Sequence, residues 1–233
     1  MQAVFPKKWY CMKFEGYEKA LSVPRIGRYK TACHGDKNKA LVLYRYNIKL
    51  GQKFYGLLGV LEVVLRNAID EHYKAILNDQ NWLITQAKSG FLVEYRETIL
   101  NEKDKLICKH KYSHDKPVAS LCLGVWTFLF SRNCYKNSGK TLLQIFPNKT
   151  HGFNQKDIYA DLDKIRRFRN RIAHHEHLCF GICGSVSVHY VKKIYALVIR
   201  YVHFLGYSSS ELLYGVETPL PTIEKIRNLA ETL

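Results

Sequence analysis

The sequence predicts an all-α fold, a helical bundle with a basic irregular N-terminal segment and an extra C-terminal helix. Apolar residues recur at intervals of three and four along several segments, and no segment alternates with the period of two that a strand requires. No internal repeat is present, and 47% hydrophobic residues in a chain of 233 suffice for a core. We expect a basic N-terminal extension over residues 1–38, a helical domain over 39–207 and a helical tail over 208–233.

The N-terminal extension is expected to be irregular, apart from a short helix at Tyr17 to Leu21, because residues that break helices interrupt it. These are Pro6, Pro24, Gly27 and Gly35. From Lys39 to Asn78 the pattern predicts one long helix that continues through Gly51. Its apolar stripe consists of Phe54, Leu57, Leu58, Leu61, Val64, Leu65 and Ala68. Glu62 and Arg66, four residues apart within it, suggest an ion pair along the helix.

The rest of the chain predicts a connection at 81–84 followed by shorter helices. A helix over 91–109 carries apolar residues on one side, and a helix over 118–130 is apolar on most faces, which predicts deep burial. Residues 140–146 form a short segment before Pro147, and 179–184 form a loop. Further helices are expected over 154–174, with Asn154 or Asp157 as cap, over 185–205, and from Pro221 to Leu233.

The charge of the chain is strongly positive and unevenly distributed. It holds 36 Lys and Arg against 20 Asp and Glu, a net charge of +16, with a pI near 9.5. The first 50 residues alone hold eleven basic and three acidic side chains. Such a balance indicates a polyanionic partner, and it favours nucleic acid over a merely solvated surface because aromatic residues lie between the charges. These are Trp9, Tyr10, Tyr17, Tyr29, Tyr44 and Tyr46.

The cysteines and the apolar runs indicate a cytoplasmic protein with no membrane partner. The seven cysteines are odd in number and several lie in apolar stretches, as expected for reduced, packed thiols. Cys179 and Cys183 have histidines nearby, but no second pair at zinc-finger spacing, so neither a metal site nor a cofactor is expected. Residues 1–8 lack the apolar core of a signal peptide, and the run Leu121–Phe130 is half the length of a membrane span.

The segment from Arg166 to Glu176 carries the main chemical signal. It contains four arginines, one asparagine and two adjacent histidines within eleven residues. Arginine binds phosphate through paired donors, and histidine exchanges protons near neutral pH, so together they suit metal-free cleavage of a phosphodiester. No carboxylate cluster for two magnesium ions accompanies them.

A helical wheel places Ile165, Phe168 and Ile172 on the buried face of this segment. Arg169 and His174 are about 140° apart on an ideal helix. Both can therefore reach one phosphate only if Arg169 extends around the helix, or if the helix ends or bends near Ala173. We expect it to end before His177, where a run rich in cysteine and glycine begins.

Arg169, Asn170 and His174 match the pattern Arg-Asn-x-x-x-His, which resembles the signature of the HEPN superfamily of all-helical RNases. Two further blocks resemble the Abi-like proteins of bacterial phage defence and extend the resemblance over roughly residues 40 to 205. They are the helix with Tyr46-Asn47-Ile48-Lys49-Leu50 and Leu61-Glu62-Val63-Val64-Leu65-Arg66-Asn67-Ala68-Ile69, and the segment Gly124-Val125-Trp126-Thr127-Phe128-Leu129.

The resemblance implies an endoribonuclease that acts as a toxin in abortive infection. His174 would be the general base or acid, Arg169 would stabilise the charged phosphorane, and Asn170 would orient the phosphate or the histidine. The 2′-hydroxyl would attack the phosphorus and leave a 2′,3′-cyclic phosphate, so that RNA is cut and DNA is spared. Secondary RNA contacts would come from Arg166, Arg171 and His175, with Arg66 and Asn67 near the cleft.

The resemblance also implies a homodimer, because HEPN RNases pair two motif helices across one cleft. A toxic enzyme needs restraint, which a bound non-coding RNA or a partner protein would supply. Two alternatives remain at this stage. In one, the same arginines make the protein a non-catalytic RNA-binding module that holds a structured or non-coding RNA. In the other, the basic surface meets an acidic protein partner.

Overall fold

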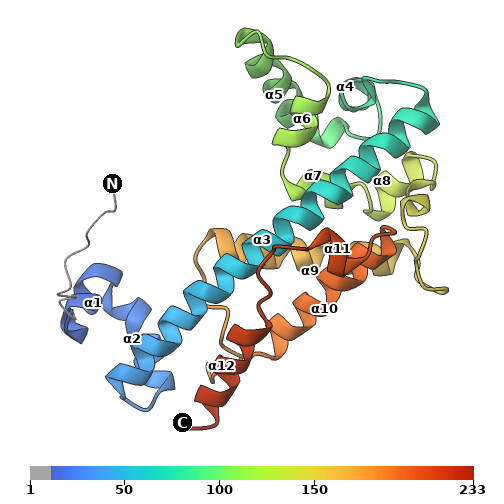
Figure 1. Ribbon diagram of the computed structural model, residues 1–233. Helices are drawn as coiled ribbons and strands as arrows, with labels where there is room; N and C mark the ends of the chain where they lie inside the picture. Colours follow the sequence, from blue (N-terminus) through green and yellow to red (C-terminus); the bar gives the residue numbers. More distant parts are fainter. Residues whose placement is uncertain (1–11) are drawn as a thin grey trace, which may run out of the picture.

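The computed structural model describes residues 12–233, and within this range the regular secondary structure is helical (Figure 1). One isolated antiparallel bridge joins Phe180 and Val186 across a loop. The predicted all-α class is therefore confirmed for the described residues. Pro6, one of the predicted helix breakers, and Trp9 and Tyr10, two of the aromatic residues between the charges, lie outside them.

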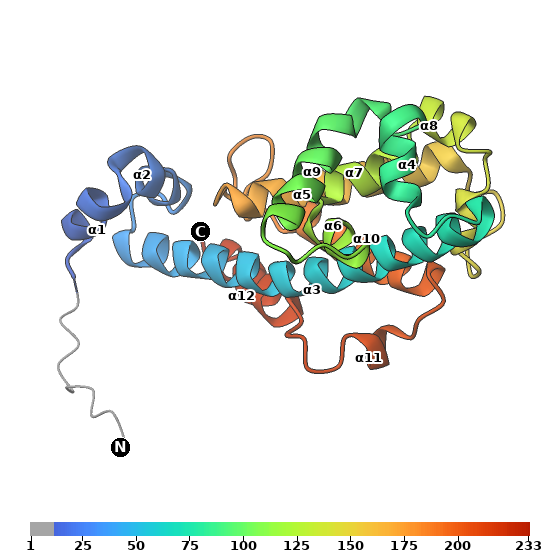
Figure 2. The same cartoon turned by 90° about the horizontal axis from the view of Figure 1, so that it is seen from above.

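The long helix α3, Lys37–Leu77, is the axis of the fold, and the other elements gather along it (Figures 1 and 2). Its 41 residues make it about 60 Å long. It begins where Asp36 accepts hydrogen bonds from the backbone N–H groups of Asn38 and Lys39, and it ends at Asn78 in the left-handed conformation. The prediction of one continuous helix with a buried stripe is confirmed.

Two helices, α1 (Phe14–Leu21) and α2 (Val23–Ala32), pack near the N-terminal end of α3 (Figure 2). The prediction of an irregular segment is wrong for most of this stretch. Pro24 lies in the first turn of α2, where its missing N–H costs no hydrogen bond, and a Cβ on Gly27 would meet open space. Ile26 and Tyr29 of α2 are fully buried against the core.

Five short elements surround the C-terminal end of α3 in Figure 1. They are α4 (Trp82–Ser89), the 3₁₀ turn η1 (Val93–Tyr95), α5 (Arg96–Cys108), α6 (Asp115–Ser120) and α7 (Leu123–Phe128). The predicted connection at 81–84 is thus part of a helix, and the predicted helix over 118–130 is two helices separated at Leu121 and Cys122. Burial on most faces, seen at Trp126, left no periodicity from which to place that break.

The helix that carries the motif, α9 (Gln155–Ala173), crosses α3 and packs beside α10 (His189–Phe204). Before α9 the chain forms α8 (Arg132–Asn137) and the 3₁₀ turn η2 (Leu142–Ile145). After α10, α11 (Ser209–Leu212) leads to α12 (Leu220–Ala230), which packs along the N-terminal half of α3 (Figures 1 and 2). Among the helices of residues 12–233, none is both long and apolar enough to cross a membrane.

Candidate functional site

The position of the motif is fixed by both ends of α9. At its start, Asn154 accepts from the backbone N–H groups of Lys156 and Asp157, and Asp157 accepts from the Asn154 N–H in return. This capping box satisfies donors that the first turn would otherwise leave free. Ile165 and Phe168 are buried, and the Phe168 ring packs edge-on against Phe54 of α3, with 4.8 Å between ring centroids.

The end of α9 turns the chain sharply at the two motif histidines. His174 caps the helix, and His175 follows with φ +53° in the left-handed region. The backbone N–H of His175 donates to Ile172 and that of Glu176 donates to Arg171, which together form a Schellman motif. Glycine is the usual residue at this left-handed position, so His175 carries backbone strain. The prediction that the helix ends near Ala173 is confirmed.

Each motif arginine lies beside a carboxylate. The Nε of Arg169 is 3.9 Å from Oε2 of Glu62 in α3, so the predicted pair of Glu62 with Arg66 is not the one formed. Arg166 donates to Asp163 through Nε and Nη2, and Arg167 donates to the second oxygen of the same carboxylate. Only part of the guanidinium charge therefore remains for a phosphate, and the carboxylates fix the side chains in place.

Arg171 lies on the opposite side of the helix end from Arg166. Its Nε donates to Glu176 at 2.9 Å, and its guanidinium lies over the ring of Tyr190, 5.3 Å from the centroid. Arg166 instead lies near α7, where its Cδ would be 4.0 Å from a Cβ on Gly124. These two predicted RNA contacts do not share one surface.

His174 and Asn170 are both exposed on the outside of α9. Within residues 12–233, no side chain is hydrogen-bonded to the imidazole of His174 or to the amide of Asn170; the Asn170 carbonyl only accepts the backbone N–H of His174. Arg169 points instead toward α3 and Glu62. The three residues predicted to be catalytic thus share one helix end without forming a closed triad.

Arg66 and Asn67 lie farther along α3, beside a different part of the molecule. The Nη1 of Arg66 donates to the carbonyl of Ala119 in α6 at 2.8 Å, and its Nε is buried without a partner among the described residues. Asn67 is exposed and lines a cavity with Arg66, Asp70 and Asp115. That cavity contains none of the motif residues of α9.

Asn47, in the first block of the resemblance, fixes the loop that follows the motif. Its side chain is only 3% exposed; the oxygen accepts from the Leu178 N–H at 2.6 Å and the amide donates to the Glu176 carbonyl. The sequence contained a signal for this role, because Asn47 interrupts the apolar stripe formed by Leu43, Leu50 and Phe54. A polar residue in a buried stripe indicates a backbone group that needs a partner.

His177 connects the same loop to α2. Its Nδ1 is 2.9 Å from the hydroxyl of Tyr29. Burial lowers the pKa of His177, and the nearby charges of Arg28 and Arg25 lower it further. Arg25 also donates to the His175 carbonyl. Helix α2, which the sequence did not predict, therefore supports the strained turn of the motif.

Two cavities lie on either side of this turn. One, of about 510 Å³, is mostly apolar and is lined by His175, Ile172, Gln52 and the exposed ring of Tyr55. The other, of about 920 Å³, is bordered by basic side chains from three elements. These are Arg28, Arg171, His177, His189 and Lys193. Arg28 and Lys193 were not among the predicted RNA contacts, because only the fold brings them to the motif.

No group of three His, Cys, Asp or Glu side chains in the described part of the chain is placed to hold a metal ion. Cys179 and Cys183, considered above for zinc, differ in environment. Cys179 is fully buried, and burial raises the pKa of its thiol to about 12, whereas Cys183 is exposed. A buried thiol of this kind behaves as a small apolar side chain.

Comparison of the chain with protein-family models, curated proteins and solved structures finds no match. Fold and site define a class: a strongly basic protein whose regular secondary structure over residues 12–233 is helical and in which one helix ends in exposed arginine and histidine residues. Its function is therefore inferred from the chemistry of that site.

Proposed function

We propose that this protein is a metal-independent endoribonuclease of HEPN type, a cytoplasmic toxin of abortive infection that acts as a homodimer. The observation that carries the proposal is the end of α9, where an accessible imidazole, His174, lies five residues after an arginine that is paired with a carboxylate, Arg169. The resemblance of the sequence to Abi-like proteins supplies the biological role, and the net charge of +16 suits an RNA substrate.

In the proposed reaction the 2′-hydroxyl of RNA attacks the adjacent phosphorus. One imidazole accepts the hydroxyl proton, and a second imidazole protonates the leaving 5′-oxygen. The guanidinium of Arg169 stabilises the negative charge that develops on the phosphorane oxygens. The products are a 2′,3′-cyclic phosphate and a 5′-hydroxyl, so no water or oxidant is consumed in this step.

The second imidazole would come from His174 of another copy. The motif places one histidine, His174, at the position that the resemblance makes catalytic, while the concerted reaction uses both an acid and a base. A two-fold axis near the α9 C-termini would bring two copies of His174 to one phosphate. The outward position of His174 and Asn170 is compatible with such pairing.

The test is cleavage of a labelled RNA in EDTA by the wild-type protein and by His174→Ala. Loss of a general acid or base lowers the rate by about 10²–10⁴-fold. His151→Ala is a matched control, because His151 is also exposed and lies before the opposite end of α9. We expect His174→Ala alone to lose cleavage, with a DNA analogue intact throughout. Equal cleavage by all three proteins would contradict the proposal.

The second candidate function is a non-catalytic RNA-binding module that holds a structured or non-coding RNA. The separation of Arg169 from the exposed His174 favours it over catalysis, since Arg169 is directed toward Glu62 of α3 and the three predicted catalytic residues form no closed triad. The basic cavity around Arg28 and Lys193 would then bind phosphates. Unchanged RNA affinity in His174→Ala, with no cleavage by the wild type, would support this alternative.

A further inference from the structure

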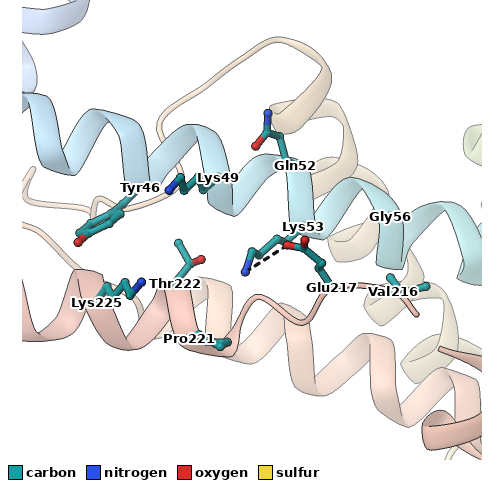
Figure 3. A pocket seen from close by; sticks show the side chains of 10 residues that line it. All are labelled: Tyr46, Lys49, Gln52, Lys53, Gly56, Val216, Glu217, Pro221, Thr222 and Lys225. Atoms are coloured by element: carbon teal, nitrogen blue, oxygen red, sulfur yellow. Dashed lines mark ion pairs between the residues drawn. The ribbon is translucent and has the colours of Figure 1, made fainter. Parts of the chain in front are cut away.

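A second basic cavity lies between α3 and α12, on a stripe of α3 that is separate from the end of α9 (Figure 3). Its volume is about 540 Å³, within the range of small-ligand pockets. Three lysines line it, Lys49 and Lys53 from α3 and Lys225 from α12, together with a single carboxylate, Glu217.

The cavity exists because polar residues occupy positions where two packed helices usually meet. α12 is anchored to the core by Ile223 and Ile226, which are at most 1% exposed, and its end is tied to α3 by a hydrogen bond from Lys39 to the Thr232 carbonyl. Beside the start of α12, the stripe of α3 that lines the cavity consists of Tyr46, Lys49, Gln52, Lys53 and Gly56. Apolar side chains at these positions would pack against α12 and fill the space. The polar ones leave a cavity lined with hydrogen-bond donors.

The segment before α12 approaches α3 at Gly56, although the approach does not require a glycine there. A Cβ at this position would lie 3.4 Å from Cγ1 of Val216, in ordinary contact. Glu217 follows directly, and its carboxylate is 3.4 Å from the Nζ of Lys53. Because Glu217 is 79% exposed while Lys53 is only 21% exposed, the pair is one that an anionic ligand can replace.

The other polar groups that line the cavity add hydrogen-bond donors. Figure 3 shows Thr222 and Lys225 extending from α12 while Lys53 descends from α3 toward Glu217. Thr222 is 4% exposed, and no side chain or backbone group of residues 12–233 is hydrogen-bonded to its hydroxyl. Tyr46 contributes a hydroxyl, whereas the side chain of Gln52 extends away from α12 in Figure 3.

We infer that this cavity binds a phosphate group, of an RNA chain or of a free nucleotide, through Lys49, Lys53 and Lys225. Three ammonium groups against one carboxylate select an anion, and lysine binds phosphate as a point charge. The Thr222 hydroxyl would complete the shell around the phosphate oxygens. Gln52 also lines the cavity beside His175, so the two sites are neighbours across α3. The inference does not depend on nuclease activity.

The experiment measures binding to the purified full-length protein with probes that cannot be cleaved. The probes are a fluorescent 2′-O-methyl RNA, AMP and inorganic phosphate. Loss of one charged contact lowers affinity by about tenfold. We therefore expect Lys53→Gln to weaken binding about tenfold and to lower the salt dependence by about one counterion. Glu217→Gln, which frees Lys53, should strengthen binding.

Lys136→Gln is the matched control, because Lys136 is an exposed lysine of α8, distant from α12 in both views of the fold (Figures 1 and 2). Weaker binding of all three probes by Lys53→Gln would assign the cavity to a free phosphate or nucleotide. Weaker binding of the RNA alone would assign it to the RNA chain. Equal affinities of Lys53→Gln and Lys136→Gln for every probe, or weaker binding by Glu217→Gln, would overturn the inference. Thermal unfolding of each variant verifies that it is folded.

Discussion

Two polar clusters, one near the C-terminal end of α3 and one at the end of α9, differ in how their polar groups are satisfied. Near the C-terminal end of α3, Asp70 is buried and accepts from Trp82 Nε1, His114 Nε2 and Lys74 Nζ at 2.7–2.8 Å. At the end of α9, His174 and His175 are exposed, and the imidazole of His174 has no protein partner among residues 12–233. One cluster is closed to solvent, and the other is open to it.

The difference separates stability from chemistry. A buried carboxylate with three donors holds α3, α4 and the segment before α6 together, and its oxygens are occupied by these donors, while Nδ1 of His114 is buried without a partner among the described residues. The open helix end contributes few contacts to the core, yet it offers an imidazole and guanidinium groups to a ligand. A histidine beside a carboxylate can therefore serve either stability or chemistry in this chain, and its accessibility to solvent decides which.

The largest effect on stability is expected from Asp70→Asn. The change removes the carboxylate that Trp82, His114 and Lys74 share in a buried site, and breaking such a buried pair typically costs about 3–5 kcal/mol, although Lys74 keeps Glu71 and Asp115 at 3.6 and 3.8 Å. Asp104→Asn, at an exposed position of α5, is the matched control and should cost less than about 0.5 kcal/mol. Urea unfolding measures both. If Asp70→Asn cost no more than the control, the cluster would not hold these elements together.

The same carboxyl group also predicts acid sensitivity. Burial raises the pKa of Asp70, but the hydrogen bonds from His114, Lys74 and Trp82 outweigh burial and hold the pKa below its usual value. A pKa that is lower in the folded state adds stability above the usual value of an aspartate. That stability is lost as pH falls through the folded pKa. Asp70→Asn should therefore flatten the decline of stability at acid pH.

Long periodic elements were predictable from the sequence, and elements decided by tertiary contacts were not. The stripe around Phe54 and Leu61 determines α3, and Asn154 with Asp157 determines the start of α9. Helix α4 was missed because the evidence for it is the buried contact of Trp82 with Asp70, twelve residues earlier. Helix α2 was missed because Pro24 was taken as a breaker although it lies in the first turn.

The candidate site shows the same limit. The motif residues of α9 are visible in sequence, as is the spacing that pairs Asp163 with Arg166 and Arg167. The pair of Arg169 with Glu62 spans more than a hundred residues and follows only from the crossing of α3 and α9. The same holds for Arg28 and Lys193 beside Arg171.

His177 is partly buried, and so differs both from the buried Asp70 cluster and from the exposed end of α9. Its substitution is expected to have a smaller, pH-dependent effect on stability. Burial, aided by Arg28 and Arg25, lowers the pKa of His177, so the folded state favours the neutral ring. Its contribution to stability is therefore present above the unfolded pKa, near 6.5, and is lost as pH falls below that value. We expect His177→Gln to reduce the slope of stability between pH 7 and pH 5. Exposed His203→Gln should leave the slope unchanged, and equal slopes in all three proteins would contradict the assignment.

The smallest effect on stability is expected from substituting His175, and it is a gain in stability where the changes above cause a loss. Its φ of +53° is the left-handed position of the Schellman motif, where glycine adopts the conformation without strain. His175→Gly should therefore stabilise the protein by about 0.5–1 kcal/mol, less the entropy that glycine adds to the unfolded chain. His175→Ala, which keeps the strain and removes the imidazole, is the matched variant.

RNA binding separates the two properties of His175. If the imidazole contacts RNA, as the sequence predicts, both variants should bind the 2′-O-methyl RNA more weakly, although only the glycine variant gains stability. A stable variant with impaired binding would mean that the strained turn is retained for the side chain it carries, as backbone strain at functional sites often is. Unchanged binding in both variants would limit His175 to the helix cap and leave His174 as the one histidine of the proposed reaction.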